Sequence, residues 1–174
     1  ALFSHMFNKA REWGYTDNPN PCAGVKGYKE SGRDVYVSDE LYKSVWMAAE
    51  QPLRDVLDLS YLTAQRPADV LKMSAEDIID NELHITQNKT KQRLRIAIEG
   101  ELEELLNRLP KEGRLLRNSK GQNLTYYMFR GLFDKARLKA GIEFNDFQLK
   151  DLRAKAGTDK EEKQGMAAAK DQLG

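Results

Sequence analysis

Residues 53–69 read LRDVLDLSYLTAQRPAD, an apolar helical pattern that runs into a short polar turn. The apolar side chains cover most of the helix circumference: Leu53, Val56, Leu57, Leu59 and Leu62. A helix that is hydrophobic on nearly all sides is expected to be buried in the middle of a domain. Pro52 suits its first turn. We therefore predict a central helix that begins near residue 52 and ends within residues 63–67.

Arg66 lies where this helix meets a shorter helical piece, which we expect over residues 68–73. At such a junction a guanidinium could point into a cleft. Asp69 follows three residues later, a spacing at which a carboxylate can hold the arginine in place. An arginine at a helix junction is more commonly a cap or an ion-pair partner, so the pair alone does not identify a functional site.

Two strands are expected after this turn, because the apolar period changes from helical spacing to two. Leu83 and Ile85 alternate with polar neighbours, and the same alternation recurs over residues 94–98. These segments predict a small antiparallel sheet. The polar connection between them projects Lys89 and Lys91 from its tip, although lysines at exposed turns are commonplace on protein surfaces.

Helical spacing governs most of the remaining chain. Further helices are expected after a cap at Ser38, over residues 102–109, from residue 129 to about residue 141, over residues 149–158 and over residues 161–173. The predicted fold class is therefore mainly α with a small antiparallel β-sheet (α+β).

Basic side chains gather in two places. Lys150 and Arg153 stand three residues apart, so they share one face of the helix expected there. Two cations held side by side repel each other unless an anion joins them, and a phosphate is the obvious candidate. Residues 111–139 hold eight Lys or Arg against two acidic residues. An exposed, solvated basic face is the alternative interpretation of both clusters.

The amino-terminal segment differs from the rest of the chain. Apolar residues between Leu2 and Trp13 form one stripe at helical spacing, which predicts an amphipathic helix that ends near Gly14. The next stretch is dense in turn-forming residues, as is typical of a linker. The expected organisation is the last helix of a preceding domain at 1–16, a linker at 17–36 and the main domain at 37–174.

Composition excludes several classes of protein. The chain has 174 residues, a net charge of +1, one cysteine and two histidines. No Cys or His cluster has metal-ligand spacing, so we expect no metal and no cofactor, and the single Cys22 cannot form an internal disulfide, which fits a reducing cytosol. No apolar run approaches the roughly 18 residues needed to cross a bilayer. We expect a cytoplasmic protein that is neither secreted nor membranous.

Three short patterns occur in one order along the chain. TAQRPAD at 63–69 ends the apolar helix, KTK at 89–91 lies between the strands, and KDLR at 150–153 lies on a later helix. This order resembles the tyrosine recombinase, or phage integrase, family. There the patterns are typically Thr-Gly-x-Arg-x-x-Glu, a hairpin lysine often followed by Thr-Gly, and His-x-x-Arg. The first helix and the linker also resemble the end of that family's core-binding (SAM-like) domain. The resemblance spans nearly the whole chain and implies the tyrosine recombinase catalytic-core fold.

The resemblance also implies roles for individual residues. Arg66 and Arg153 would bind the nonbridging oxygens of the scissile phosphate, where negative charge builds up in the transition state. Lys89 would donate a proton to the departing 5′ oxygen, with Lys91 as the alternative. Asp69 would orient Arg66.

The sequence departs from the family pattern at several positions. Ala64 and Asp69 replace the usual glycine and glutamate, which are mild changes. Lys150 replaces the histidine, and because a lysine is charged at neutral pH we expect it to bind phosphate rather than to act as a base. Further candidates for DNA binding are Lys91, Arg93 and Arg130.

In this family a tyrosine attacks DNA to form a 3′-phosphotyrosyl link, a short way beyond a Leu-Gly that is followed by His or Trp. All seven tyrosines of this chain precede Lys150, and the sequence ends at Leu173-Gly174. We therefore expect a C-terminally truncated catalytic domain that binds DNA weakly and cleaves nothing. The complete protein would be a site-specific DNA recombinase, the integrase of a phage or genomic island.

The implied partner is double-stranded DNA at attachment sites, in the cytoplasm of a bacterial cell at the nucleoid. The complete protein is expected to form a homotetramer on DNA, whereas the fragment is expected to be monomeric, and an accessory DNA-bending protein is a candidate further partner. A noncatalytic DNA-binding protein that retains the fold is the main alternative. A helical scaffold that meets only proteins would show no salt-sensitive DNA affinity. A type IB topoisomerase shares the chemistry, but the linker and the small size favour a recombinase.

Overall fold

The computed structural model describes residues 2–28, 32–33 and 35–174, and the chain divides into two compact units, Ala1–Asp34 and Val35–Gly174. In the first unit, helix α1 (Leu2–Glu12) has no buried residue. The turn segment after it folds back, because Asn20 Nδ2 donates hydrogen bonds to the Ser4 carbonyl at 3.0 Å and to Asn8 Oδ1 at 2.7 Å. The assignment of residues 1–16 to a core-binding domain, and of residues 17–36 to a linker, stays a prediction.

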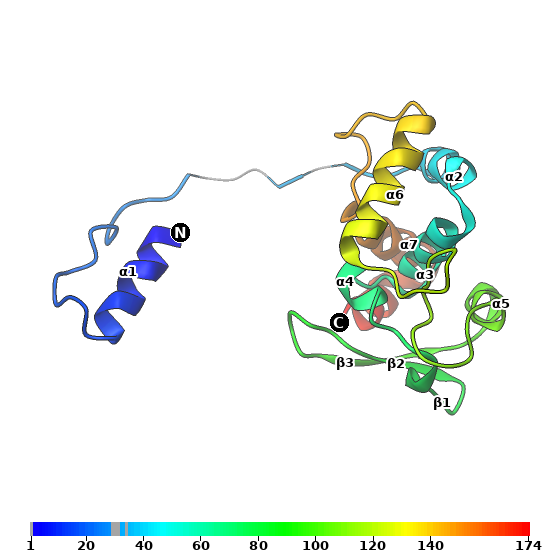
Figure 1. The fold of residues 1–174 in the computed structure, drawn as a ribbon, viewed down its shortest axis with the longest axis horizontal. Coiled ribbons are helices and arrows are strands. Elements are labelled where there is room, and N and C mark those ends of the chain that lie inside the picture. The colour runs from blue at the N-terminus through cyan, green and yellow to red at the C-terminus, as the bar shows by residue number, and fades with distance from the viewer. Residues whose placement is uncertain (1, 29–31, 34) are drawn as a thin grey trace. The chain divides into compact units, whose positions relative to one another are not determined.

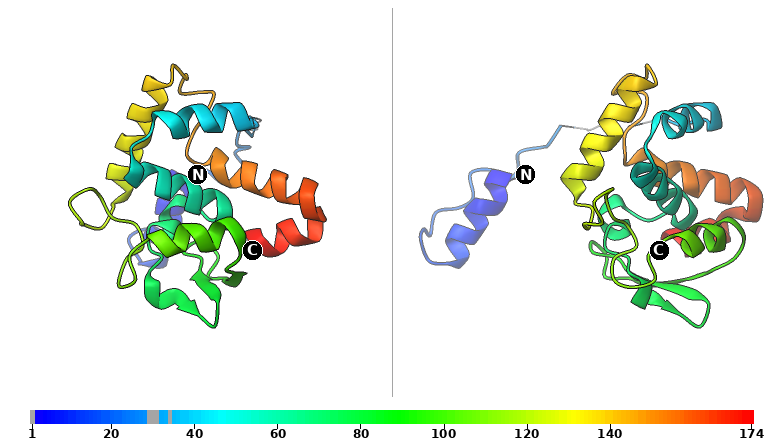
Figure 2. Two further views of the ribbon diagram at one scale, coloured as in Figure 1. Left: turned by 90° about the vertical axis from the view of Figure 1, so that its right-hand side faces the viewer. Right: turned by 45° about the vertical axis from the view of Figure 1, so that its right-hand side comes forward.

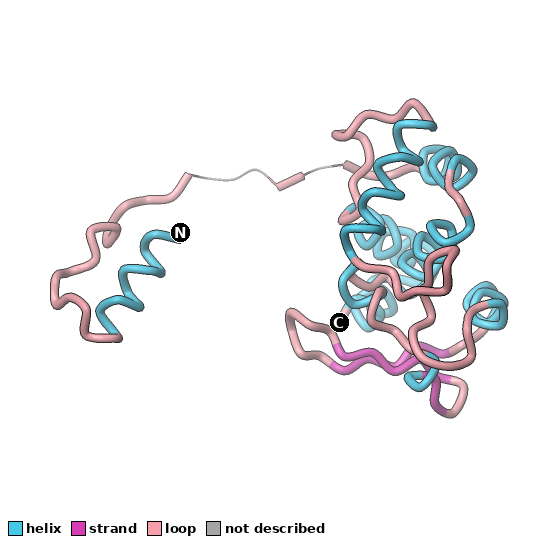
Figure 3. The backbone as a smooth tube through the Cα atoms, in the orientation of Figure 1, coloured by secondary structure: helices cyan, strands magenta, loops and turns pink. Residues whose placement is uncertain are grey.

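The second unit is mainly helical, with a small sheet at one end (Figures 1 and 3). The expected fold class, mainly α with a small antiparallel sheet, is confirmed. Its elements, in chain order, are α2 (Asp39–Ala48), α3 (Gln51–Thr63), α4 (Pro67–Val70), the 3-10 helix η1 (Ala75–Asp77), β1 (Ile78–Ile79), β2 (Glu82–Thr86), β3 (Arg93–Ala97), α5 (Gly100–Arg108), α6 (Tyr126–Lys139) and α7 (Asp151–Leu173).

Helix α3 forms the centre of this unit, as its apolar sequence predicts. Leu53, Val56 and Leu57 are each at most 1% exposed, and the helix packs against α2, α5, α6 and α7. Burying a side chain of this kind contributes about 1.5–3 kcal/mol. The helix ends at Ala64, which adopts a left-handed conformation with φ 54°. The turn that follows places Arg66 directly before α4, where it is the N-cap.

The sheet is antiparallel in the order β1-β2-β3. Leu83 pairs with Ile96, and Ile85 pairs with Leu94, so the apolar side chains share the face that packs on the core. The sequence did not predict β1, because Ile78–Ile79 is too short to show alternation. A two-residue turn of positive φ, Asp80 and Asn81, joins it to β2.

The carboxyl-terminal helices differ from the prediction. Instead of two helices separated near residues 159–160, α7 continues through that region and is interrupted at Gly165, where φ is 87° and ψ is 166°. Lys155 and Asp159 form an ion pair at 3.0 Å, one helical turn apart, across the expected break. Figure 2 shows that the last turns of α7 reverse direction, which returns Leu173 toward the core.

Helix length and hydropathy also bear on membrane insertion. Across the described parts of the chain, no helix combines the length and the hydrophobicity that a bilayer span requires.

Candidate functional site

Two arginines far apart in sequence meet beside the end of α3. Arg66 caps α4, and Arg153 lies in the first turn of α7, which packs against α3. The Arg153 side chain donates from Nη1 to the Ala64 carbonyl at 3.1 Å, in the turn just before Arg66. The tertiary packing of α3 and α7 therefore brings the first and third sequence patterns together.

Two buried glutamines connect the arginines. Arg66 Nη1 donates to Gln87 Oε1 at 2.9 Å, and Gln87 Nε2 donates to Gln65 Oε1 at 2.9 Å. Arg153 Nη1 lies 3.4 Å from the same Gln65 oxygen. Both glutamines have 0% exposure. A continuous hydrogen-bonded path thus runs from one guanidinium to the other.

The guanidiniums lie close enough to influence each other electrostatically. Burial lowers the pKa of Arg153, the charge of Arg66 lowers it further, and Asp69 acts in the opposite direction. Arginine keeps its proton under any ordinary condition, so the burial of Arg153 and the nearby charge of Arg66 both act on a cation that stays charged. A tetrahedral oxyanion bound between them would relieve that repulsion and accept hydrogen bonds from both.

Asp69 lies beside Arg66 but also holds the hairpin. Its carboxylate is 1% exposed and approaches Arg66 Nη1 at 4.0 Å through Oδ2. Oδ1 accepts a 2.9 Å hydrogen bond from the Asn88 backbone, in the β2–β3 connection. Oδ2 is buried and has no hydrogen-bond partner among the described residues. The orienting role of Asp69 stays a prediction, and its carboxylate links α4 to the hairpin.

The hairpin lysines are placed by the same connection. Thr90 Oγ1 donates to Gln87 Oε1 at 2.6 Å, and Lys91, at φ 59°, donates its backbone N–H to the Gln87 carbonyl at 2.9 Å. The base of the hairpin is thus fixed next to the arginines. The side chains of Lys89 and Lys91 are exposed, so the approach of either amine to a phosphate stays a prediction.

Lys150 is exposed at the N-terminus of α7 and borders two hollows. One, of about 490 Å³, it shares with Arg153 and Leu173. The other, of about 220 Å³, it shares with Arg130. Lys150 therefore lies near Arg153 in one hollow and near Arg130 in the other. Arg130 Nε also lies 3.8 Å from Asp134 Oδ2.

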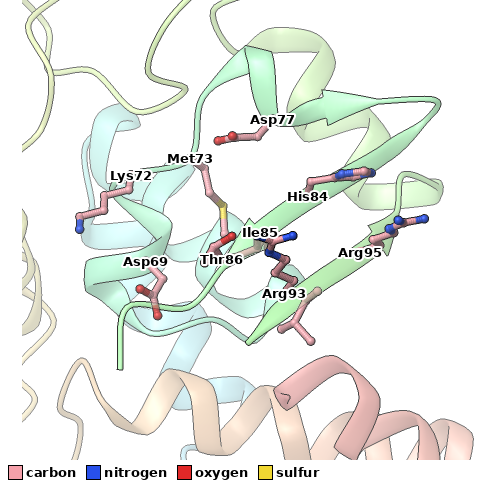
Figure 4. Close-up of a pocket in the computed structure, with 10 residues that line it drawn as sticks. Asp69, Lys72, Met73, Asp77, His84, Ile85, Thr86, Arg93 and Arg95 are labelled. Carbon is pink, nitrogen blue, oxygen red and sulfur yellow. The ribbon is translucent and has the colours of Figure 1, made fainter. Parts of the chain in front are cut away.

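A third hollow, of about 410 Å³, is lined by residues from α4 and η1 and from strands β2 and β3 (Figure 4). Its lining includes the strand residues His84, Arg93 and Arg95, with Lys72 and Asp69 at the other side. Arg93 is exposed here. This position separates Arg93 from the hollow that Lys150 shares with Arg153, and a DNA-binding role for Arg93 stays a prediction.

Sequence reasoning missed Gln65 and Gln87 as parts of the site. Gln65 stands inside the first pattern, and Gln87 ends the second strand, yet a glutamine is ordinarily a surface residue. Within the part of the chain that the structure describes, no group of three or more His, Cys, Asp or Glu could hold a metal ion.

Sequence comparison identifies proteins that are similar to this chain. A sequence model of the phage integrase family matches residues 38–174. The integrase of Escherichia phage HK022 is 35% identical over 82 residues, which cover 45% of this chain and 23% of that protein. The integrase of Enterobacteria phage 434 is 30% identical over 93 residues, which cover 52% of this chain and 26% of that protein. The matched part spans about a quarter of these relatives.

Solved structures share the fold. A lambda integrase (75-356) dimer bound to a COC' core site has a TM-score of 0.84 at 22% identity, over 99% of this chain and 68% of that one. A lambda integrase tetramer bound to a Holliday junction has a TM-score of 0.84 at 22% identity, over 98% and 55%. The catalytic domain of bacteriophage HP1 integrase has a TM-score of 0.62 at 19% identity, over 80% and 79%. Because the family model covers most of the sequence, this chain belongs to the phage integrase family.

Proposed function

We propose that this chain supplies the phosphate-binding groups of a site-specific DNA recombinase, which cuts and rejoins DNA through a 3′-phosphotyrosyl intermediate. The observation that supports this most strongly is the hydrogen-bonded path joining Arg66 to Arg153 through Gln87 and Gln65. Planar guanidiniums held in fixed positions suit the charge that builds up on nonbridging oxygens during phosphoryl transfer.

In the proposed mechanism, the two arginines bind one scissile phosphate and Lys150 contributes a third charge at its edge. Lys89 would transfer a proton to the departing 5′ oxygen, because its exposed side chain starts from a hairpin fixed beside Arg66. Lys91 is the alternative donor. Asp69 would limit the movement of Arg66 and of the hairpin together.

The nucleophilic tyrosine of the family is not assigned within this chain. Tyr36 and Tyr61 both donate to Asp159, and Tyr42 donates to Asp58. Burial raises the pKa of Tyr42 and Tyr61, and the adjacent carboxylates raise it further. Such phenols resist the deprotonation that a nucleophile requires. In the family the attacking tyrosine follows the third pattern, and all seven tyrosines of this chain precede Lys150. We therefore propose that the attacking tyrosine is supplied from outside residues 1–174.

The proposed substrate is duplex DNA at an attachment site, bound by a homotetramer on DNA. The similar lambda integrase structures contain a dimer on a core site and a tetramer on a Holliday junction, which supports a DNA partner and assembly on DNA. An accessory DNA-bending protein and a location at the bacterial nucleoid belong to the same proposal.

A second candidate is a noncatalytic DNA-binding protein of the same fold. Lys150 favours it, because a charged lysine stands where the family pattern has a histidine. That protein would bind DNA through the same arginines and form no covalent link.

The two candidates are separated by a nicked duplex that carries the attachment site and traps the covalent intermediate. The full-length gene product should form a protein–DNA adduct, and Arg66→Ala or Arg153→Ala should abolish it. Lys163→Ala, which removes an exposed lysine of α7, should leave it unchanged. Failure of the unsubstituted protein to form any adduct would favour the noncatalytic candidate.

A further inference from the structure

The side-chain amide of Gln87 joins four separate parts of the fold. Its oxygen accepts from Arg66 Nη1 at 2.9 Å and from Thr90 Oγ1 at 2.6 Å. Its nitrogen donates to Gln65 Oε1 at 2.9 Å and to the Leu173 carbonyl at 2.7 Å. The amide therefore contacts the cap of α4, the hairpin, the end of α3 and the end of α7.

These four bonds fix the orientation of the amide. An amide oxygen offers two lone pairs and an amide nitrogen two hydrogens, so every hydrogen-bonding position of Gln87 is occupied. A rotation by half a turn would point its N–H groups at Arg66 and its oxygen at the Leu173 carbonyl. Both contacts would then be repulsive, in a place with no exposure to water.

Gln65 is satisfied in the same way. Its nitrogen donates to the Thr63 carbonyl at 3.0 Å and to the Gln172 carbonyl at 2.8 Å. Its oxygen faces Gln87 Nε2 at 2.9 Å and Arg153 Nη1 at 3.4 Å. Because neither amide can turn independently, the position of Arg66 is tied to that of Arg153.

The Arg66 side chain is 31% exposed and lies near a second cation. Without a fixed acceptor it would move away from Arg153 into water, since like charges repel and a solvated guanidinium has many rotamers. When the protein holds the Arg66 side chain in place, the conformational entropy is lost during folding. Less entropy is then lost when the oxyanion binds.

We propose that Gln87 is a positioning residue, which holds Arg66 in register with Arg153 so that both bind one tetrahedral oxyanion. This inference rests on the proposed phosphate-binding function, because it assigns how the same site is prepared. Gln87 acts through Arg66 and does not itself contact the phosphate.

The test uses this chain and inorganic sulfate, a tetrahedral dianion whose charge is constant over ordinary pH. Sulfate affinity is followed by NMR at the Arg153 Nε–Hε resonance in the wild type and in Gln87→Met, which keeps the side-chain length and removes all four hydrogen bonds. Gln92→Met, at an exposed glutamine of the same hairpin, is the matched control. The same Gln87→Met substitution is also made in an Arg66→Met background.

Gln87→Met should weaken sulfate binding about tenfold, the usual cost of losing a hydrogen bond to a charged group. Gln92→Met should have no effect, and Gln87→Met should add no further loss in the Arg66→Met background. Wild-type affinity in Gln87→Met, or an equal loss in both backgrounds, would overturn the proposal.

Two further outcomes are distinguishable. A wild-type chain with no sulfate response at Arg66 or Arg153 would remove the phosphate site itself, and with it the proposed function. If Gln87→Met does not fold, the sulfate titration of the wild-type protein provides the test. The NMR signals of the Gln87 Nε2 amide protons should then shift together with those of Arg66. Shifts at both arginines with none at Gln87 would contradict a positioning role.

Discussion

Lys150 is an exposed lysine at the start of α7 that borders the same hollow as Arg153. An ammonium group there adds attraction for a phosphate oxygen. Lys150→Gln in the full-length gene product should therefore slow formation of the covalent adduct about tenfold, equivalent to about 1.4 kcal/mol of transition-state stabilisation. Single-turnover cleavage of the nicked duplex measures it. An unchanged rate, with Lys163→Gln as the control, would remove Lys150 from the site.

Lys155 is a second residue whose contacts allow a prediction, here about the stability of the fold. It is 2% exposed and bonded to Asp39 and Asp159. Burial alone would lower the pKa of Lys155, but the two carboxylates outweigh it and raise the pKa. Burial would likewise raise the pKa of Asp159, but hydrogen bonds from Tyr61 and Lys155 outweigh it and lower the pKa.

The ion pair should therefore stabilise the fold only within a defined pH range. A lowered Asp159 pKa gives stability that is lost as pH falls below about 4, and a raised Lys155 pKa gives stability that is lost as pH rises above about 10. Lys155→Met removes the cation that pairs with the buried Asp159 carboxylate and should lower the free energy of unfolding by about 3–5 kcal/mol at pH 7. Urea denaturation measures it, and a loss below about 1 kcal/mol would contradict the assignment.

At the residue scale, the sequence singled out Arg66 and Arg153 as candidates, because their patterns occur in the family order. It did not indicate the side chains that connect them, and the phosphate-binding role of both arginines stays a prediction. Gln87 follows a strand as an ordinary polar residue, and only tertiary packing gives it four partners. Ala64 shows why the family pattern has a glycine there, since its φ of 54° is a conformation that glycine adopts most easily.

At the scale of the secondary-structure elements, α7 is the helix that the sequence predicted least well, because its interruption lies at Gly165. Gly165 adopts φ 87° and ψ 166°, a region that is essentially restricted to glycine. Gly165→Ala should therefore lower the free energy of unfolding by about 1–3 kcal/mol and displace the last turns of α7. Urea denaturation at neutral pH provides the measurement.

The control for this prediction is Gly131→Ala, in the exposed middle of α6, where no atom of the described residues lies within 4 Å of the added methyl group apart from its chain neighbours and the local helix backbone. Alanine favours a regular helix, so this change should stabilise the protein by about 0.5–1 kcal/mol. If Gly165→Ala were stabilising to the same extent, α7 would be an unbroken helix, and the return of Leu173 to the site would be wrong.

Most other helices and strands could be predicted because local sequence patterns, such as helix caps and alternating apolar residues, determine them. Ser38 accepts from the Leu41 N–H at 3.2 Å, as a helix cap does, and the two longer strands occur where alternation predicts them. The break in α7 was misplaced because a buried ion pair, Lys155 with Asp159, stabilises the helix through a polar stretch. Such tertiary interactions are not visible in periodicity.

At the scale of the whole molecule, a net charge of +1 conceals a local concentration of cations around Arg66, Arg153 and Lys150. Affinity of the chain for duplex DNA should therefore fall steeply as salt increases, because bound cations displace counterions from phosphates. Arg66→Met should reduce the slope of log affinity against log salt by about one. Fluorescence anisotropy at several salt concentrations measures it. A salt-independent affinity would indicate a protein-binding scaffold.

One measurement tests most directly whether a single phosphate lies between the two arginines. Crystals of the chain soaked in tungstate, a tetrahedral oxyanion with strong anomalous scattering, should show a tungsten peak between the two side chains, with its oxygens within about 3 Å of both the Arg66 and the Arg153 guanidinium nitrogens. Tungstate bound to only one of these arginines, or only at other surfaces, would contradict the account.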